Sequence, residues 1–98
     1  MKDVWQALSH PVRREILALL REGAMGAGAI GEKFDMAGAS LSQHLKTLRE
    51  AGLVSVEVDG TARIYRLNVS VAEDALTGLL DLLGVGTAPI SDRKESNT

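Results

Sequence analysis

The chain contains no cysteine. This absence excludes disulfide bonds and thiolate metal sites, and with them the usual chemistry of soft-metal sensing. Aromatic residues make up only 3% of the sequence, so the core must consist mostly of aliphatic side chains, which suits packed helices. No apolar run approaches the roughly 20 residues of a membrane-spanning helix, and the first residues lack the apolar segment of a signal peptide. A cytoplasmic protein is therefore expected.

An excess of positive charge is also missing. The formal net charge is −2, which argues against nucleic-acid binding by bulk charge but is compatible with a local basic face. Residues 40–49 hold Lys46 and Arg49 with no acidic residue, whereas residues 67–86 hold acidic residues and no basic one. We expect the two ends of the fold to differ in electrostatic potential.

Length and turn signals predict a single domain. The chain has 98 residues, of which 45% are hydrophobic, enough for one modest core. Residues 1–83 are predicted to form the domain and residues 84–98 a flexible tail. Periodicity and turn residues predict helices at 3–8, 11–22 and 26–34, a turn at 35–38, a helix that stops at Gly52, strands at 53–58 and 62–67, and a last helix at 70–83.

A glycine-rich stretch spells G-x-G-x-x-G at residues 26–31. The dinucleotide-binding interpretation needs a preceding strand and a doubly wound sheet. Here a predicted helix precedes the motif, and the chain is too short for such a sheet. We expect a short helix instead, with small residues that allow close packing and with Ile30 and Phe34 pointing inward.

The central pattern is a helix-turn-helix followed by a hairpin. Leu41, Leu45 and Leu48 form one apolar stripe, and the remaining faces of that helix are polar. The Asp59-Gly60 pair between two β-rich segments is a hairpin signal. The predicted fold is mainly α with a β-hairpin wing, a winged helix-turn-helix of order α-α-α-α-β-β-α.

The last helix is apolar around most of its circumference, so it must bury more than one side. In so small a domain, the additional apolar surface indicates contact with a second copy. Trp5 would be an anchor of this interface or of the core. The predicted dimerisation residues are Val4, Trp5, Leu8, Leu76, Leu79, Leu80 and Leu83.

Three stretches together resemble the ArsR/SmtB family of bacterial winged-helix repressors, and the similarity is greatest to its metal-independent SdpR-type autorepressors. The stretches are 7–17 (ALSHPVRREIL), 41–54 (LSQHLKTLREAGLV) and 60–67 (GTARIYRL). The resemblance implies that the fourth helix enters the major groove, that the wing touches the flanking backbone, and that the first and last helices form a homodimer.

The sequence departs from the family pattern at several positions. It has no cysteine, and its last helix has no histidine, so neither metal control nor a cofactor is predicted. Thr61 stands where family wings carry a basic residue, and Glu57 and Asp59 are acidic, which predicts weaker wing contacts. Ala37 stands where many members have a capping serine, so the start of the recognition helix would be frayed or shifted.

The predicted DNA contacts come from the recognition helix and the wing. Glutamine can read adenine through its paired donor and acceptor, serine can bond a base edge or a phosphate, and the cations would neutralise phosphates. Solvation of an ordinary helix face is the alternative explanation of the same polar residues. The predicted DNA-binding residues are Ser40, Ser42, Gln43, His44, Lys46, Thr47, Arg49, Thr61 and Arg63.

The two histidines suggest no catalysis. His44 would touch a phosphate, brace its helix or be structural, and His10 is interpreted as structural. Ser42 and His44 lie close in sequence, but no orienting acid or oxyanion hole is recognisable. We therefore predict that the protein is not an enzyme.

The sequence predicts a homodimeric, sequence-specific repressor of a bacterial promoter that does not respond to metals. Its partner would be double-stranded DNA with a pseudo-palindromic operator, and it would be nucleoid-associated when bound. The inducing signal would be a partner protein, a small ligand between the helices, or the expression level alone. The alternative is a winged-helix module for protein–protein contact with little DNA binding, which the negative net charge and the acidic wing would favour.

Overall fold

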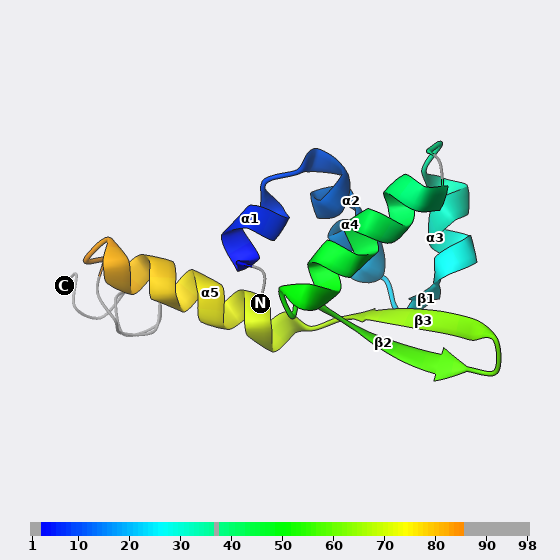
Figure 1. The fold of residues 1–98 in the computed structure, drawn as a ribbon. Coiled ribbons are helices and arrows are strands. Elements are labelled where there is room, and N and C mark those ends of the chain that lie inside the picture. The colour runs from blue at the N-terminus through cyan, green and yellow to red at the C-terminus, as the bar shows by residue number, and fades with distance from the viewer. Residues whose placement is uncertain (1–2, 37, 86–98) are drawn as a thin grey trace.

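The computed structural model describes residues 3–36 and 38–85 (Figure 1). The elements in chain order are α1 (Val4–Leu8), α2 (Pro11–Leu20), β1 (Met25–Gly26), α3 (Ala27–Lys33), α4 (Gly38–Glu50), β2 (Val54–Asp59), β3 (Ala62–Leu67) and α5 (Val69–Leu82). The predicted winged helix-turn-helix is therefore confirmed, with the addition of the short strand β1. No helix in the described part of the chain is long and apolar enough to cross a membrane.

The core lies between α2, α3, α4 and the hairpin. The largest fully buried side chains are those of Ile16, Ile30, Leu48 and Leu53, one from each of four segments. Burying a side chain of this size stabilises the fold by roughly 1.5–3 kcal/mol. Ile30 is thus an inward anchor of α3 as predicted, while Phe34 is half-buried at its end.

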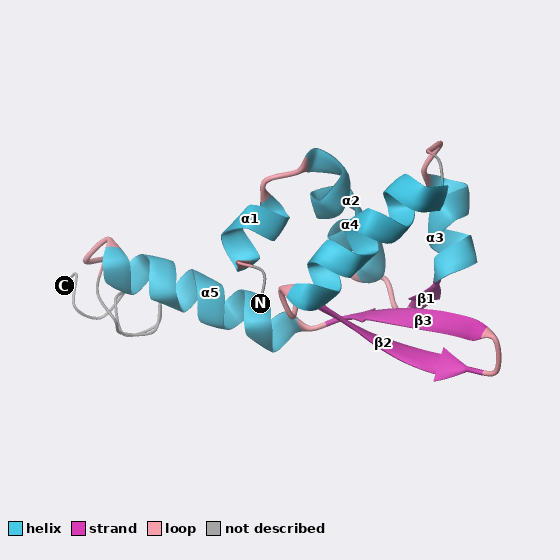
Figure 2. Cartoon of the chain, viewed as in Figure 1, coloured by secondary structure: helices cyan, strands magenta, loops and turns pink. Residues whose placement is uncertain are grey.

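The strands form one antiparallel sheet of order β1-β3-β2 (Figure 2). In β1, Met25 pairs with Tyr65 and Gly26 with Ile64. Sequence patterns missed this strand because two residues carry no alternation. It closes the free edge of β3 and fixes the start of α3 against the hairpin.

The ends of α4 and of the hairpin are set by glycine. Gly52 has a φ of 82°, and the amides of Gly52 and Leu53 donate to the carbonyls of Arg49 and Leu48, which is a Schellman cap. Asp59 is the last residue of β2, so the turn is Gly60-Thr61 rather than Asp59-Gly60. Only Gly60 has a positive φ there (65°), the pattern of a type II′ turn.

The first two helices are held together by side chains that bond to backbone groups. His10 caps α2, because its Nδ1 accepts from the Val12 amide at 3.1 Å, and Pro11 begins the helix. Arg13 donates to the Ala7 carbonyl from Nε at 2.7 Å and to the Gln6 carbonyl from Nη2 at 3.1 Å. These bonds satisfy carbonyls at the end of α1, which is too short to be stable alone.

The last helix, α5, runs away from the helix and hairpin body, in the opposite direction from the wing (Figure 1). None of its residues is buried. Gly84 and Val85 belong to its C-terminal cap, because their amides donate to Asp81 and Leu80. The rest of the predicted tail, residues 86–98, lies outside the described residues, as does Ala37 at the start of α4.

Candidate nucleic-acid interface

The recognition helix α4 presents its polar residues on two separate flanks. With about 100° of rotation per residue, Ser42, Lys46 and Arg49 gather on the flank that faces β3, and all three are exposed. Gln43 is exposed between the two flanks. Ser40 lies on the other flank, two turns before Thr47. The predicted DNA-binding edge is therefore divided.

Thr47 is nearly buried, and this position does not favour its predicted contact with DNA. The residue is only 7% exposed and is the one buried polar residue among those that the structure describes. Both α1 and α2 pack against α4, so the buried arc extends well beyond the leucine stripe on this side. The sequence gives a polar residue next to the stripe, and only the packing of α1 and α2 shows that it is covered.

His44 lies on the same flank and contacts α2. Its ring centroid is 4.4 Å from that of His10, and its Nδ1 is 3.3 Å from Nη1 of Arg13. A guanidinium only donates, so Nδ1 accepts and the neutral ring carries its proton on Nε2. The pKa of His44 is lowered from its ordinary value of 6.5, mainly because partial burial disfavours the charged ring. The charges of His10 and of the Arg13 guanidinium lower this pKa further. The structure thus gives His44 a bracing role, which was one of the predicted alternatives.

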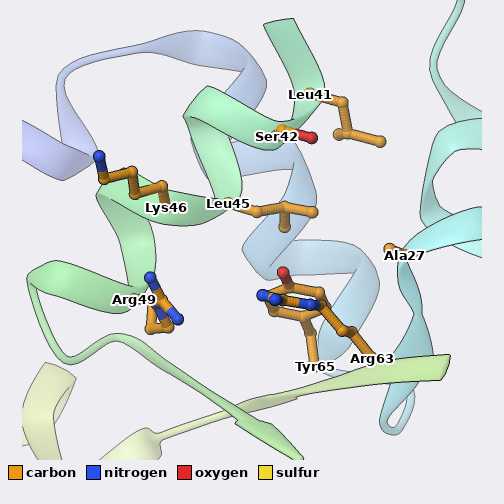
Figure 3. Close-up of a pocket in the computed structure, with 8 residues that line it drawn as sticks. All are labelled: Ala27, Leu41, Ser42, Leu45, Lys46, Arg49, Arg63 and Tyr65. Atoms are coloured by element: carbon orange, nitrogen blue, oxygen red, sulfur yellow. The ribbon is translucent and has the colours of Figure 1, made fainter. Parts of the chain in front are cut away.

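A hollow of about 310 Å³ separates α4 from β3 (Figure 3). No acidic residue lines it. Its floor is apolar, and Lys46, Arg49 and Arg63 bring three cations to its edge. The lining residues are Ala27, Leu41, Ser42, Leu45, Lys46, Arg49, Arg63 and Tyr65.

The wing separates its charges by face. Arg63 is paired with Val58, whereas Glu57 is paired with Ile64 and Asp59 with Ala62. Side chains alternate along a strand, so Arg63 shares the face of Tyr65 toward α4, and both carboxylates lie on the opposite face. Thr61 is exposed at the turn. The acidic wing residues therefore do not line the α4 side of the hairpin.

The predicted dimerisation residues divide between half-buried and exposed positions. Val4 and Leu8 pack against the core from α1, and Leu79 and Leu80 are half-buried on α5. The remaining three are open to solvent: Trp5 is 46%, Leu76 55% and Leu83 63% exposed. A groove of about 510 Å³ lies between α1 and α5, next to Trp5.

Sequence reasoning missed Arg13, Arg14 and Tyr65. Arg14 donates to the Leu8 carbonyl at 2.7 Å, and Arg13 joins α1 to α2 and contacts α4. On the sequence these arginines lie off the apolar stripe and look like ordinary surface charges. The signal that could have found them is their place directly after the break between two short helices, where unpaired carbonyls need donors.

An amphipathic helix of a helix-turn-helix, a cationic hollow beside it and an antiparallel wing together define a winged helix-turn-helix protein. A family model described as a helix-turn-helix domain matches residues 8–57. The transcriptional repressor SdpR of Bacillus subtilis (strain 168) is 38% identical over 86 residues, which cover 88% of this chain and 96% of that protein. The chain belongs to the ArsR family of winged-helix transcriptional regulators, as the sequence resemblance predicted.

Two solved structures carry the same fold. A protein described as a possible transcriptional regulator for arsenical resistance is 30% identical with a TM-score of 0.71, and the match covers 100% of this chain and 98% of that one. The homodimeric winged helix-turn-helix DNA-binding domain of a possible ArsR-family regulator from Mycobacterium bovis is 32% identical with a TM-score of 0.66. That match covers 83% of this chain and 74% of the other.

Proposed function

We propose that the protein is a homodimeric, sequence-specific DNA-binding repressor of transcription in the bacterial cytoplasm, and that its activity does not depend on a metal. The observation that carries this proposal is the flank of α4 formed by Ser42, Lys46 and Arg49. It is exposed, contains no acid and faces the same hollow as Arg63 of the wing. A helix of this kind fits a major groove while the wing reaches the flanking backbone.

The relatives support the same conclusion. SdpR is named a transcriptional repressor, and the Mycobacterium bovis structure is described as a homodimeric DNA-binding domain. Two copies of the present chain would place two α4 helices in successive major grooves, about 34 Å apart, on a pseudo-palindromic site. Sequence would be read by Gln43 and Ser42, and the cations would contact phosphates. A ligand or a partner protein would relieve repression.

The proposed function is tested by binding to the protein's own promoter, measured by mobility shift at low and at physiological salt. The double variant Gln43→Ala, Lys46→Ala should bind at least about tenfold more weakly, because it loses one base contact and one phosphate contact. Arg21→Ala is the matched control, since it removes one exposed cation after the end of α2.

The outcomes separate the site from the function. If the double variant and Arg21→Ala bind equally well, α4 does not contact DNA through Gln43 and Lys46. If the unaltered protein fails to shift its promoter even at low salt, the chain is instead a winged-helix module for protein–protein contact. The positions of Glu57 and Asp59, on the wing face away from Arg63, give no support to that alternative.

A further inference from the structure

Tyr65 combines a nearly buried ring with a hydroxyl group that bonds to nothing in residues 3–36 and 38–85. The residue is 7% exposed and its ring belongs to the core. None of the side-chain hydrogen bonds in this part of the chain involves its hydroxyl. No fully buried side-chain nitrogen or oxygen there lacks a partner, so the hydroxyl must keep access to solvent. It points from β3 into the hollow below α4 (Figure 3).

The charges around this hydroxyl all have one sign. The Arg63 side chain rises from the same strand beside Tyr65, and Arg49 lines the hollow from α4 (Figure 3). The Lys46 ammonium points away from the centre of the hollow in the same view, so the two arginines are its main cations. A solvent-accessible tyrosine hydroxyl with two guanidinium groups and no carboxylate is a donor set for an oxyanion.

The size and position of the hollow limit which class of ligand it can bind. At about 310 Å³ it is at the lower limit of small-molecule pockets, which span roughly 300–1,000 Å³. Its floor of Leu41, Leu45 and Ala27 offers no donor or acceptor to the edge of a base. It lies between the recognition helix and the wing, where the sugar–phosphate backbone would run beside a groove occupied by α4.

We propose that the α4–β3 hollow binds one phosphate group of the DNA backbone, with Arg63 and Arg49 supplying charge and the Tyr65 hydroxyl supplying a neutral hydrogen bond. This inference rests on the proposed function and adds Tyr65 to the interface. One phosphate held from both α4 and β3 fixes the depth of the helix in the groove relative to the wing. Tyr65 therefore has two roles, with its ring in the core and its oxygen at the DNA.

The test is the salt dependence of binding to a random-sequence DNA duplex, measured by fluorescence anisotropy on the full chain. Arg63→Gln should weaken binding and reduce the slope of log K against log salt by about 0.9, the value for one lost phosphate contact. Arg66→Gln is the matched control. It removes the same charge from the same strand, but residue 66 pairs with Ser55 on the opposite face of the hairpin.

Tyr65→Phe isolates the hydroxyl, because the ring stays in the core. We expect about tenfold weaker DNA binding, as for a hydrogen bond to a charged group, with an unchanged salt slope because no charge is lost. Thermal unfolding followed by circular dichroism checks that this variant folds. If it does not fold, the comparison of Arg63→Gln with Arg66→Gln still decides, since both residues are exposed.

Equal slopes for Arg63→Gln and Arg66→Gln would overturn the proposal, because they would indicate a diffuse field rather than a bound phosphate. If the unaltered protein does not bind the duplex at any salt concentration, the proposed function itself fails. A titration with inorganic phosphate, at ionic strength held constant with chloride, tests a free anion as the ligand. Two results together would assign the hollow to a free phosphate and overturn the DNA assignment. The chemical shifts of Tyr65 would change with phosphate concentration until the site is saturated, and DNA binding would be insensitive to Arg63→Gln.

Discussion

The two longest helices, α4 and α5, use their side chains in opposite ways. The recognition helix α4 is the more polar, yet Leu41, Leu45, Thr47 and Leu48 are all buried. The terminal helix α5 is rich in leucine, yet none of its residues is buried, and Leu82 is 81% exposed. Burial in this chain therefore follows from where a helix is packed, and apolar content alone does not predict it.

The contrast indicates what each helix lacks. Helix α4 has its core contacts within the chain and leaves a polar flank for a polar partner. Helix α5 has exposed leucines without a counterpart in the described residues, and the exposed Trp5 lies beside the groove between α1 and α5. Such a surface is costly to leave in water. A second copy of the chain, which presents the same surface, is the partner that we propose.

The largest difference between the two helices should appear in stability. Leu48→Ala should lower the free energy of unfolding by about 3–5 kcal/mol, because it opens a cavity at a fully buried site. Leu82→Ala should change it by less than about 0.5 kcal/mol, as an exposed substitution does. Urea unfolding at one protein concentration measures both. Similar losses in the two variants would show that α5 is packed like α4.

The second-largest effect is expected on self-association. Leu76→Glu places a charge in the centre of the α5 stripe and should weaken the dimer about 100-fold or more. Thr77→Glu is the control, because it adds the same charge at the neighbouring exposed position, off the stripe. Sedimentation equilibrium gives both dimer constants. A dimer that tolerates Leu76→Glu as well as Thr77→Glu would place the interface elsewhere.

The third-largest effect is expected on stability, from substitutions at the junction of α1, α2 and α4. Arg13→Ala removes the donors to the Ala7 and Gln6 carbonyls and the contact with His44, so the unfolding free energy should fall by about 2 kcal/mol. Arg14→Ala removes one such bond and should cost about half as much. Thermal unfolding compares them. Equal costs would mean that the His44 contact and the second carbonyl contribute nothing.

Lys46 and Thr47 are neighbours in the sequence but lie on opposite flanks of α4, so substitutions at these positions compare the two flanks. Lys46→Gln should reduce DNA affinity about fivefold and lower the salt slope by about 0.9, because one phosphate contact is lost. Thr47→Val should leave DNA binding unchanged, since the side chain is nearly buried on the flank away from Lys46. Anisotropy titrations at several salt concentrations test both. A loss of affinity in folded Thr47→Val would restore Thr47 to the interface.

The smallest expected effect is a dependence on pH. Because the folded-state pKa of His44 is lowered, its contribution to stability is complete above the unfolded pKa of about 6.5 and is lost as the pH falls below it. His44→Gln keeps an acceptor for Arg13 but cannot be protonated, so its unfolding free energy should fall less between about pH 7.5 and 5.5. If the unfolding free energies of the two proteins depend on pH in the same way, the lowered pKa of His44 is contradicted. Self-association should vary less, because α5 contains no histidine.

Much of the fold was predictable because its signals are local. Gly52 ends α4 and Gly60 forms the hairpin turn as their conformational freedom suggests, and Pro11 begins α2. The strand β1 was not predictable, since a two-residue pairing depends on β3 lying beside it. The start of the second helix was predicted correctly, but its end was placed at residue 22, whereas α2 ends at Leu20 and a turn follows.

The candidate site was predictable only as a set of polar residues. The sequence placed Ser42, Gln43, Lys46 and Arg49 off the leucine stripe, and all are exposed. It could not distinguish these from Thr47, because both flanks of a helix look alike until a neighbour covers one of them. Tyr65 was missed because an aromatic residue in a strand is usually read as core, which describes its ring and not its hydroxyl.

The sequence alone determined the class of this protein, because helical stripes, glycine turns and strand alternation are properties of a few consecutive residues. Only the tertiary structure decided which flank of α4 stays open, which face of the wing carries Arg63, and that Tyr65 and two arginines line the same hollow. These features depend on how segments distant in sequence pack. The physical reason is that burial and hydrogen bonding need residues from two segments, and the sequence of one segment supplies only one of the two partners.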